Sequence, residues 1–203
     1  LDGTGALRIL TPVAVSYQTA FARIAPLLWI RAGSVGRRID TVPTAGWEVA
    51  DAYGLTLAAI RDPDPVIVVE NKALYAVKGE LPEPPAAVEI GRAATVREGT
   101  DITIVTYGGM RTVALESAAT LAKEGIEAEI VDLRTLRPLD MEPVLESFKK
   151  TNRAIVVEEG WKSYGVGSEI VSRMYEEAFD YVDAPILRVA QKEVPLPYNR
   201  TLE

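Results

Sequence analysis

The sequence predicts an α/β fold: an open, mostly parallel sheet of about five strands with helices on both faces, preceded by part of a second α/β domain. From residue 101 onward, short β-rich runs alternate with segments whose apolar residues recur at helical spacing. Short connections join these segments, which favours parallel strands with right-handed crossovers. A further apolar run at 65–70 precedes a proline-rich stretch and belongs to the upstream domain.

The composition fits a folded domain and excludes several kinds of function. The 203 residues are 48% hydrophobic and 25% charged, which is ordinary for a globular protein. The net charge of −7 argues against nonspecific nucleic-acid binding. There is no cysteine and no histidine, so disulfides, thiolate or imidazole metal ligands and histidine catalysis are excluded within this sequence.

The amino-terminal part gives no sign of a membrane span or a secretory signal. Its most apolar stretch, 13–30, is interrupted by Gln18 and Arg23 and is too polar to cross a bilayer. The first residues show no basic region ahead of an apolar one, so we expect no signal peptide.

Residues 1–79 are predicted to form a partial, atypical domain. Helices are expected over 14–28 and 49–61, where apolar residues recur every three to four positions. The run PVIVVE at 65–70 predicts a strand buried on both faces. Residues 80–86, ELPEPPA, are interpreted as an interdomain linker because of their prolines, with an ordinary surface loop as the alternative.

Residues 87–203 are predicted to hold the main sheet. Strands are expected at 101–107, 127–133, 154–157 and 184–189, with a strand pair or arm at 88–97. Helices are expected at 112–123, after Asp140, and at 168–179.

Two details of these helices follow from individual residues. The inner face of the first helix is expected to carry Leu115, Ala118, Ala119 and Ala122. Asp140 is the expected N-cap of the second helix, and Pro143 lies in its first turn, where the missing N–H costs little.

The glycine turn at 164–168, YGVGS, is the first candidate for a binding site. It resembles the start of a dinucleotide-binding fingerprint, and a helix N-terminus can cradle phosphate. However, Ile170 replaces the third glycine of that fingerprint, and the turn follows a late strand instead of the first one. We therefore favour the interpretation that Gly165 and Gly167 let a helix start close against a strand.

Two pairs of carboxylates are the remaining candidates. Asp62 and Asp64 flank Pro63 in a turn, where a hard cation could bind, although a solvated turn is favoured. Glu158 and Glu159 lie at the carboxyl end of a parallel strand, where open α/β sheets place their sites. Adjacent strand residues point to opposite faces, so we do not expect these two glutamates to act as an acid–base pair.

Longer segments resemble a known family. They are DAYGLTLAAIRDPDPVIVVENKALY at 51–75, DLRTLRPLDMEPVLESFKKTNRAIVVEEGW at 132–161 with YGVGSEI after it, and FDYVDAPILRVAQKEVPLPYNRTLE at 179–203. Together they resemble, over residues 50–203, the beta subunit of the thiamine-diphosphate-dependent component of 2-oxo acid dehydrogenase complexes. The ending VPLPYNRTLE is more similar to the pyruvate branch than to the branched-chain branch.

The resemblance implies a fold, a cofactor and partners. Residues 87–203 would be a transketolase-type C-terminal domain and 1–79 a truncated pyrimidine-binding domain. The subunit would contribute to oxidative decarboxylation of pyruvate on thiamine diphosphate, with acyl transfer to lipoyl groups. Its partners would be an alpha subunit, in an alpha2-beta2 assembly that shares the cofactor, and the lipoyl acyltransferase core. Neither nucleic acid nor a membrane is expected as a partner, and the location would be the bacterial cytoplasm or the mitochondrial matrix.

The resemblance also implies a structural potassium ion, but no catalytic residue. In this family, backbone oxygens of a helix end and the following turn bind the ion, and the matching positions are Ala59, Ile60, Asp62 and Asp64. The family segment with the cofactor-activating glutamate has no match here, and the family's active-site histidine is absent. The family's final helix, after the PY…LE segment, also has no counterpart.

Two alternative functions stay open at this point. A non-catalytic assembly version of the subunit would bind an alpha subunit or the acyltransferase without turnover. It would explain the acidic charge and the missing catalytic segment. A generic nucleotide-binding α/β domain would depend on Gly165 and Gly167 alone.

Overall fold

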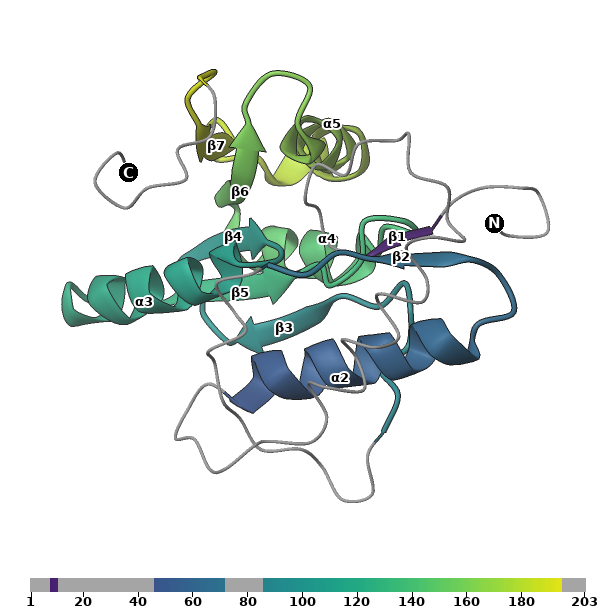
Figure 1. Cartoon of the computed structure of the whole chain (residues 1–203). Coiled ribbons are helices and arrows are strands. Elements are labelled where there is room, and N and C mark those ends of the chain that lie inside the picture. Colours follow the sequence, from purple (N-terminus) through teal and green to yellow (C-terminus); the bar gives the residue numbers. More distant parts are fainter. Residues whose placement is uncertain (1–7, 11–45, 72–85, 195–203) are drawn as a thin grey trace. The chain divides into compact units, whose positions relative to one another are not determined.

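The computed structural model describes residues 8–10, 46–71 and 86–194, which are the coloured parts of Figure 1. These residues fall into two compact units, Leu1–Ala94 with Leu133–Asp140, and Thr95–Asp132 with Met141–Glu203, where described. The predicted helix over 14–28 and all but the last residue of the predicted linker at 80–86 lie outside the described residues. The predicted domain boundaries therefore stay predictions.

The described residues of the first unit form one helix and a short strand pair. Helix α2 (Gly46–Arg61) is followed by β2 (Val66–Val68), which pairs in parallel with β1 (Arg8–Leu10). The predicted helix and strand are confirmed, although the helix begins three residues before 49. Val66 is buried, Ile67 and Val68 are half-buried, and Val69, just after β2, is buried too, so the predicted burial on both faces is met only in part. Leu55 packs against Val66 in a small apolar cluster.

A segment from the middle of the chain, Leu133–Asp140, also belongs to the first unit. The Arg134 guanidinium donates a hydrogen bond to Asp51 of α2 at 2.7 Å. The Ala93 backbone N–H donates to the Asp140 carboxylate at 3.0 Å. The predicted N-cap role of Asp140 is therefore wrong: the N-cap is Met141, and Asp140 binds a backbone donor 47 residues away instead.

The second unit holds a five-stranded sheet in the order β3-β5-β4-β6-β7. Strand β4 pairs in parallel with β5 and β6, and β6 pairs in parallel with β7. The strands are β3 (Ala94–Arg97), β4 (Ile102–Thr106), β5 (Ala128–Asp132), β6 (Ala154–Trp161) and β7 (Leu187–Gln191). The predicted fold class is confirmed, but the expected strand pair at 88–97 is wrong. A turn at 90–91 leaves only β3, since Gly91 has a positive φ of 85°.

Three helices connect these strands and cover both faces of the sheet. They are α3 (Met110–Lys123), α4 (Glu142–Thr151) and α5 (Val166–Ala178), with a short 3-10 helix at Phe179–Tyr181 after α5. Helix α3 packs on Ile104 of β4, whereas α4 contacts the neighbouring residue Thr103. Adjacent strand residues point to opposite faces, so α3 and α4 cover opposite faces. No helix among the described residues is long and apolar enough to cross a membrane.

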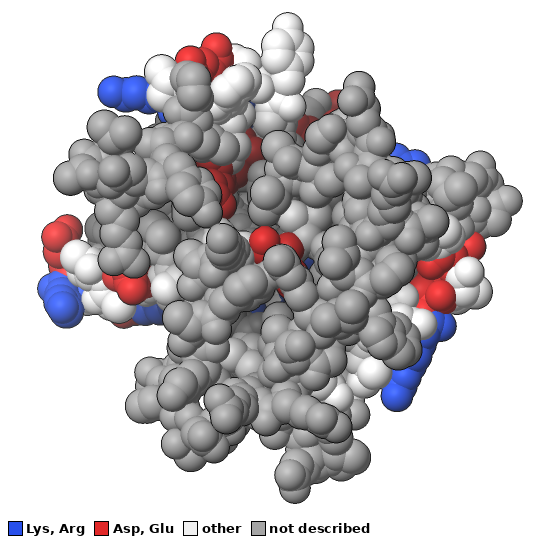
Figure 2. All heavy atoms as spheres, in the orientation of Figure 1, with Lys and Arg blue, Asp and Glu red and all other residues white. Residues whose placement is uncertain are grey.

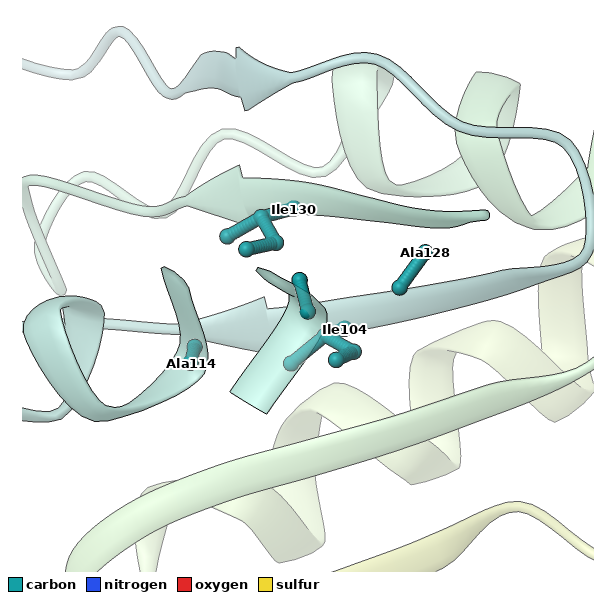
Figure 3. Close-up of a cluster of buried hydrophobic side chains, with 5 residues drawn as sticks. Ile104, Ala114, Ala128 and Ile130 are labelled. Carbon is teal, nitrogen blue, oxygen red and sulfur yellow. The ribbon is translucent and has the colours of Figure 1, made fainter. Parts of the chain in front are cut away.

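Small side chains let α3 lie close to the sheet. Figure 3 shows Ile104, Ala114, Ala128 and Ile130 converging in a cluster to which Ala118 also belongs. Ala118 is buried as predicted, but Ala119 is exposed and Ala114 is buried instead. The buried face therefore follows the spacing 111, 114, 118, which is the i, i+3, i+7 row of the same helix.

A buried polar network joins β4 and β5 to α4. The Glu129 carboxylate accepts hydrogen bonds from Lys150 and from the Gly99 N–H. Burial raises the pKa of Glu129, but the hydrogen bonds from Lys150, Ser147 and Gly99 outweigh burial and hold this pKa below its ordinary value. Glu129 is 3% exposed, so the network stabilises the sheet only while this carboxyl is ionised.

This network predicts how stability depends on pH. A carboxyl whose pKa is lowered by folding stabilises the fold above its unfolded pKa, and this stabilisation is lost as pH falls through the folded pKa. Replacing Glu129 by Gln should cost about 1.5–3 kcal/mol at pH 7, the usual range for a hydrogen bond to a charged group. The difference from wild type should shrink as pH falls below 4.5, the ordinary pKa of this carboxyl. Urea unfolding at a series of pH values measures both quantities.

Glu98→Gln is the matched control, because Glu98 also faces Lys150 but its side chain is 84% exposed. An exposed pair of this kind contributes little, so this variant should stay close to wild type at every pH. Parallel pH profiles for wild type and Glu129→Gln would contradict the assignment.

Candidate functional site

The strand order places the expected ligand crevice between β4 and β6. From β4 the chain continues to β5 on one side, and then crosses to β6 on the other side. In open α/β sheets, ligands bind outside the carboxyl ends of the strands at this reversal of direction. The residues at the ends of β4 and β6 are therefore the first candidates for a site.

A buried carboxylate fills this position. Glu158, the fifth of the eight residues of β6, is 3% exposed, and Tyr107, directly after β4, is 5% exposed. Glu158 Oε2 accepts hydrogen bonds from the Tyr107 hydroxyl and from the Gly167 N–H, each at 3.0 Å. Glu159 is exposed, so the prediction that the two glutamates point to opposite faces is confirmed.

The two glycines of the YGVGS turn make room for this carboxylate. A Cβ on Gly167 would lie 2.5 Å from Glu158 Oε1, and one on Gly165 would lie 2.6 Å from the Trp161 carbonyl oxygen. Neither separation is tolerated by real Cβ atoms. The favoured interpretation, glycines that let the helix begin against the strand, is confirmed, and α5 begins at Val166, two residues before the predicted start.

The charge of the Glu158 carboxylate also affects the pKa of Tyr107. Burial, together with the nearby Glu158 carboxylate, raises the pKa of Tyr107 well above its ordinary value. Tyr107 therefore stays neutral at physiological pH and acts as a hydrogen-bond donor to Glu158. Sequence reasoning missed Tyr107, because 51 residues separate it from its partner.

A second buried charged pair lies at the carboxyl end of β5. Arg111, in the first turn of α3, donates to Asp132, the last residue of β5, at 3.1 Å. The two side chains are only 4% and 7% exposed. Sequence reasoning also missed this pair, since neither residue belongs to a recognisable motif.

The four predicted potassium ligands lie together at the end of α2. Ala59 and Ile60 belong to its last turn, where helix carbonyl groups lack intrahelical N–H partners, although the Ala58 carbonyl oxygen accepts from the Asp62 N–H at 2.9 Å. The Asp62 side chain accepts a hydrogen bond from the Asp64 N–H at 3.0 Å, which fixes the turn. In the described parts of the chain, no three acidic side chains are arranged to hold a metal ion. A cation here would depend on backbone oxygens, and the ion stays a prediction.

The charged side chains on the visible surface are mixed in sign. Figure 2 shows Lys and Arg next to Asp and Glu at both edges of the face, in the residues that are described. Such mixing is typical of a solvated surface.

Fold and site together define an open, doubly wound α/β domain with a buried glutamate at its switch point. A family model described as "Transketolase, C-terminal domain" matches residues 91–203. The chain belongs to this family.

Curated relatives show which kinds of subunit this chain is similar to. The pyruvate dehydrogenase E1 component subunit beta of Rhizobium meliloti is 49% identical over 158 residues, 77% of this chain and 34% of the relative. The mitochondrial subunit of Homo sapiens is 44% identical over 162 residues, 77% of this chain and 45% of the relative. The beta subunit of acetoin:2,6-dichlorophenolindophenol oxidoreductase from Cupriavidus necator is 51% identical over 153 residues, 75% of this chain and 45% of the relative.

These matches confirm the resemblance to pyruvate dehydrogenase beta subunits. The chain spans between a third and a half of the length of these relatives. Among solved structures, a split-gene transketolase, described as an inactive beta4 tetramer, has a TM-score of 0.62 at 25% identity. It covers 93% of this chain and 49% of its own.

The glycine turn gives a first prediction for the site. Replacing Gly167 by Ala should destabilise the protein by about 1–3 kcal/mol, because the new methyl group overlaps the Glu158 carboxylate. Gly160→Ala is the control, since a Cβ there meets nothing within 4 Å. Equal urea midpoints for the two variants would show that Gly167 does not need to be glycine.

The buried pair gives a second prediction. Arg111→Met should cost about 3–5 kcal/mol, because it leaves the Asp132 carboxylate buried next to an apolar side chain. Asp132→Leu in the same chain should restore much of that loss, and the double-mutant cycle measures the coupling. Arg173→Met, which breaks a half-exposed pair with Glu177, should cost less than about 1 kcal/mol. Additive single changes would contradict a coupled pair.

Proposed function

We propose that this chain is part of the beta subunit of a pyruvate dehydrogenase-type enzyme. The observation that carries the proposal is identity of 44–49% to such subunits over 77–78% of the chain, in bacterial and mitochondrial relatives. The matched length exceeds the C-terminal domain at 91–203, so the likeness extends into the upstream unit. The proposed reaction is oxidative decarboxylation of pyruvate with acyl transfer to lipoyl groups. The names of the relatives support a location in the bacterial cytoplasm or the mitochondrial matrix.

The proposed cofactor is thiamine diphosphate, shared with an alpha subunit. When bound, it supplies the carbanion chemistry needed to decarboxylate a 2-oxo acid. The described residues do not fit its diphosphate at the switch-point crevice, because Glu158 already occupies the start of α5. The resemblance implies that the alpha subunit holds the diphosphate, and we propose an assembly role for residues 87–203, with the acyltransferase core as the further partner.

Acetoin is the second candidate substrate. The Cupriavidus necator relative, at 51% identity, carries acetoin in its name, and its identity to this chain is as high as that of the pyruvate enzymes. Pyruvate has a carboxylate that acetoin lacks, so the two substrates require different recognition at the reacting end. The described residues carry no contact that would distinguish them.

The deciding experiment combines the chain, within its full-length coding sequence, with a matching alpha subunit. We expect co-purification, and dichlorophenolindophenol reduction that requires pyruvate, thiamine diphosphate and Mg²⁺ together. Acetoin in place of pyruvate tests the second candidate. Assembly without turnover on either substrate would favour the non-catalytic assembly subunit, and failure to assemble would refute the proposal.

The proposed potassium ion at Ala59, Ile60, Asp62 and Asp64 has its own test. An ion that binds only the folded state stabilises it by about 2.7 kcal/mol at a concentration one hundred times its Kd. Thermal unfolding in KCl should therefore occur at a higher temperature than in choline chloride of equal ionic strength. Asp64→Ala should keep this difference, because backbone oxygens are the proposed ligands. Identical unfolding temperatures in the two salts would rule out the site.

A further inference from the structure

The amino terminus of α5 has the geometry of an anion site. This helix has 13 residues; in its first turn the Ser168 N–H donates to the Gly165 carbonyl oxygen at 3.0 Å, whereas the Gly167 N–H points at a side chain instead of a backbone carbonyl. Together with the helix dipole, these groups favour a negative charge at this end. Gly165 and Gly167 remove the side chains that would keep a ligand away from the backbone.

A buried carboxylate points into this position. Glu158 Oε2 accepts a hydrogen bond from the Gly167 N–H, while Glu158 Oε1 is buried with no hydrogen-bond partner among the described residues. Oε1 lies 2.5 Å from the place where a Gly167 Cβ would be. A buried carboxylate with one unsatisfied oxygen is costly unless the helix end compensates its charge.

We propose that the start of α5 is an anion site whose ligand is built into the chain: the Glu158 carboxylate occupies it and keeps the crevice between β4 and β6 closed to phosphate-bearing ligands. The glycine turn thus has the backbone geometry that can bind a phosphate, but the Glu158 carboxylate of the same chain is the anion bound there. A tethered ligand competes at high effective concentration, and its negative charge repels a second anion. This inference does not depend on which enzyme the chain belongs to.

The test removes the internal ligand and offers an external one. The full chain is compared with Glu158→Ala and, as control, with Glu159→Ala, whose side chain is exposed. Inorganic phosphate and pyrophosphate are the probes, against chloride at equal ionic strength. Glu158→Ala should unfold at a lower temperature and regain roughly 5–10 °C at phosphate one hundred times its Kd. Wild type and Glu159→Ala should show no phosphate-specific shift.

The amide resonance of Gly167 provides a local readout in the same proteins. Phosphate should shift it in Glu158→Ala at concentrations about tenfold lower than any that affect wild type. An equal response in wild type would overturn the proposal, because the crevice would then be open. A folded Glu158→Ala that ignores phosphate would overturn it as well, because the helix end would then not be an anion site.

A second variant keeps the proposal testable if Glu158→Ala does not fold. Glu158→Gln retains the shape and an acceptor oxygen for the Gly167 N–H, but it removes the charge. A charge-assisted hydrogen bond then becomes a weaker neutral one, so the Gly167 amide proton should move upfield. An unchanged Gly167 resonance would show that the carboxylate is not the ligand.

Discussion

The contact between the Glu158 carboxylate and the start of α5 determines how the second half of the sheet is built. It joins β6 to the first turn of α5 through one hydrogen bond of 3.0 Å, from the Gly167 N–H to the buried Glu158 carboxylate. Strand β7 is tied to the same place, because Arg188 donates to the Lys162 carbonyl oxygen at 2.7 Å and to the Ser168 hydroxyl. Two neighbouring sets of polar contacts therefore hold the start of α5, one to β6 through Glu158 and one to β7 through Arg188.

Strand β5 forms an ion pair with a helix on each of its two faces. Glu129 and Asp132 point to opposite faces of the sheet, as their spacing along the strand requires. The helix on each face supplies the matching cation, Lys150 from α4 and Arg111 from α3. Ion pairs as well as apolar packing thus hold β5 against the helices on both faces of the sheet. Both side chains of the Arg111–Asp132 pair are buried, whereas Lys150 is 43% exposed, so removing one partner should cost more at the Arg111–Asp132 pair.

Much of the fold was predictable from the sequence, because apolar periodicity is a local property. It located α3, β5 and α5 to within about two residues, since each element is long enough to show its period. Features that depend on distant partners were not predictable. Aspartate is a residue type favoured at N-caps, yet the Asp140 carboxylate accepts a hydrogen bond from the Ala93 N–H, 47 residues away. The candidate site divides in the same way: the position of Glu158 followed from strand direction, whereas its partner Tyr107 did not.

Under the proposed inference, the switch point of this doubly wound domain holds the chain's own carboxylate in place of a separate ligand. Its strand order creates the usual binding position, and its glycine turn creates an anion site there. Once Glu158 occupies that site, the helix dipole stabilises the fold instead of binding a ligand. The same holds for Gly165, Gly167 and Tyr107. Residues that would indicate a nucleotide site in another protein are then required here for a structural reason. Under the proposed function this is the expected outcome, since the cofactor chemistry belongs to other parts of the assembly, and the domain contributes a rigid surface.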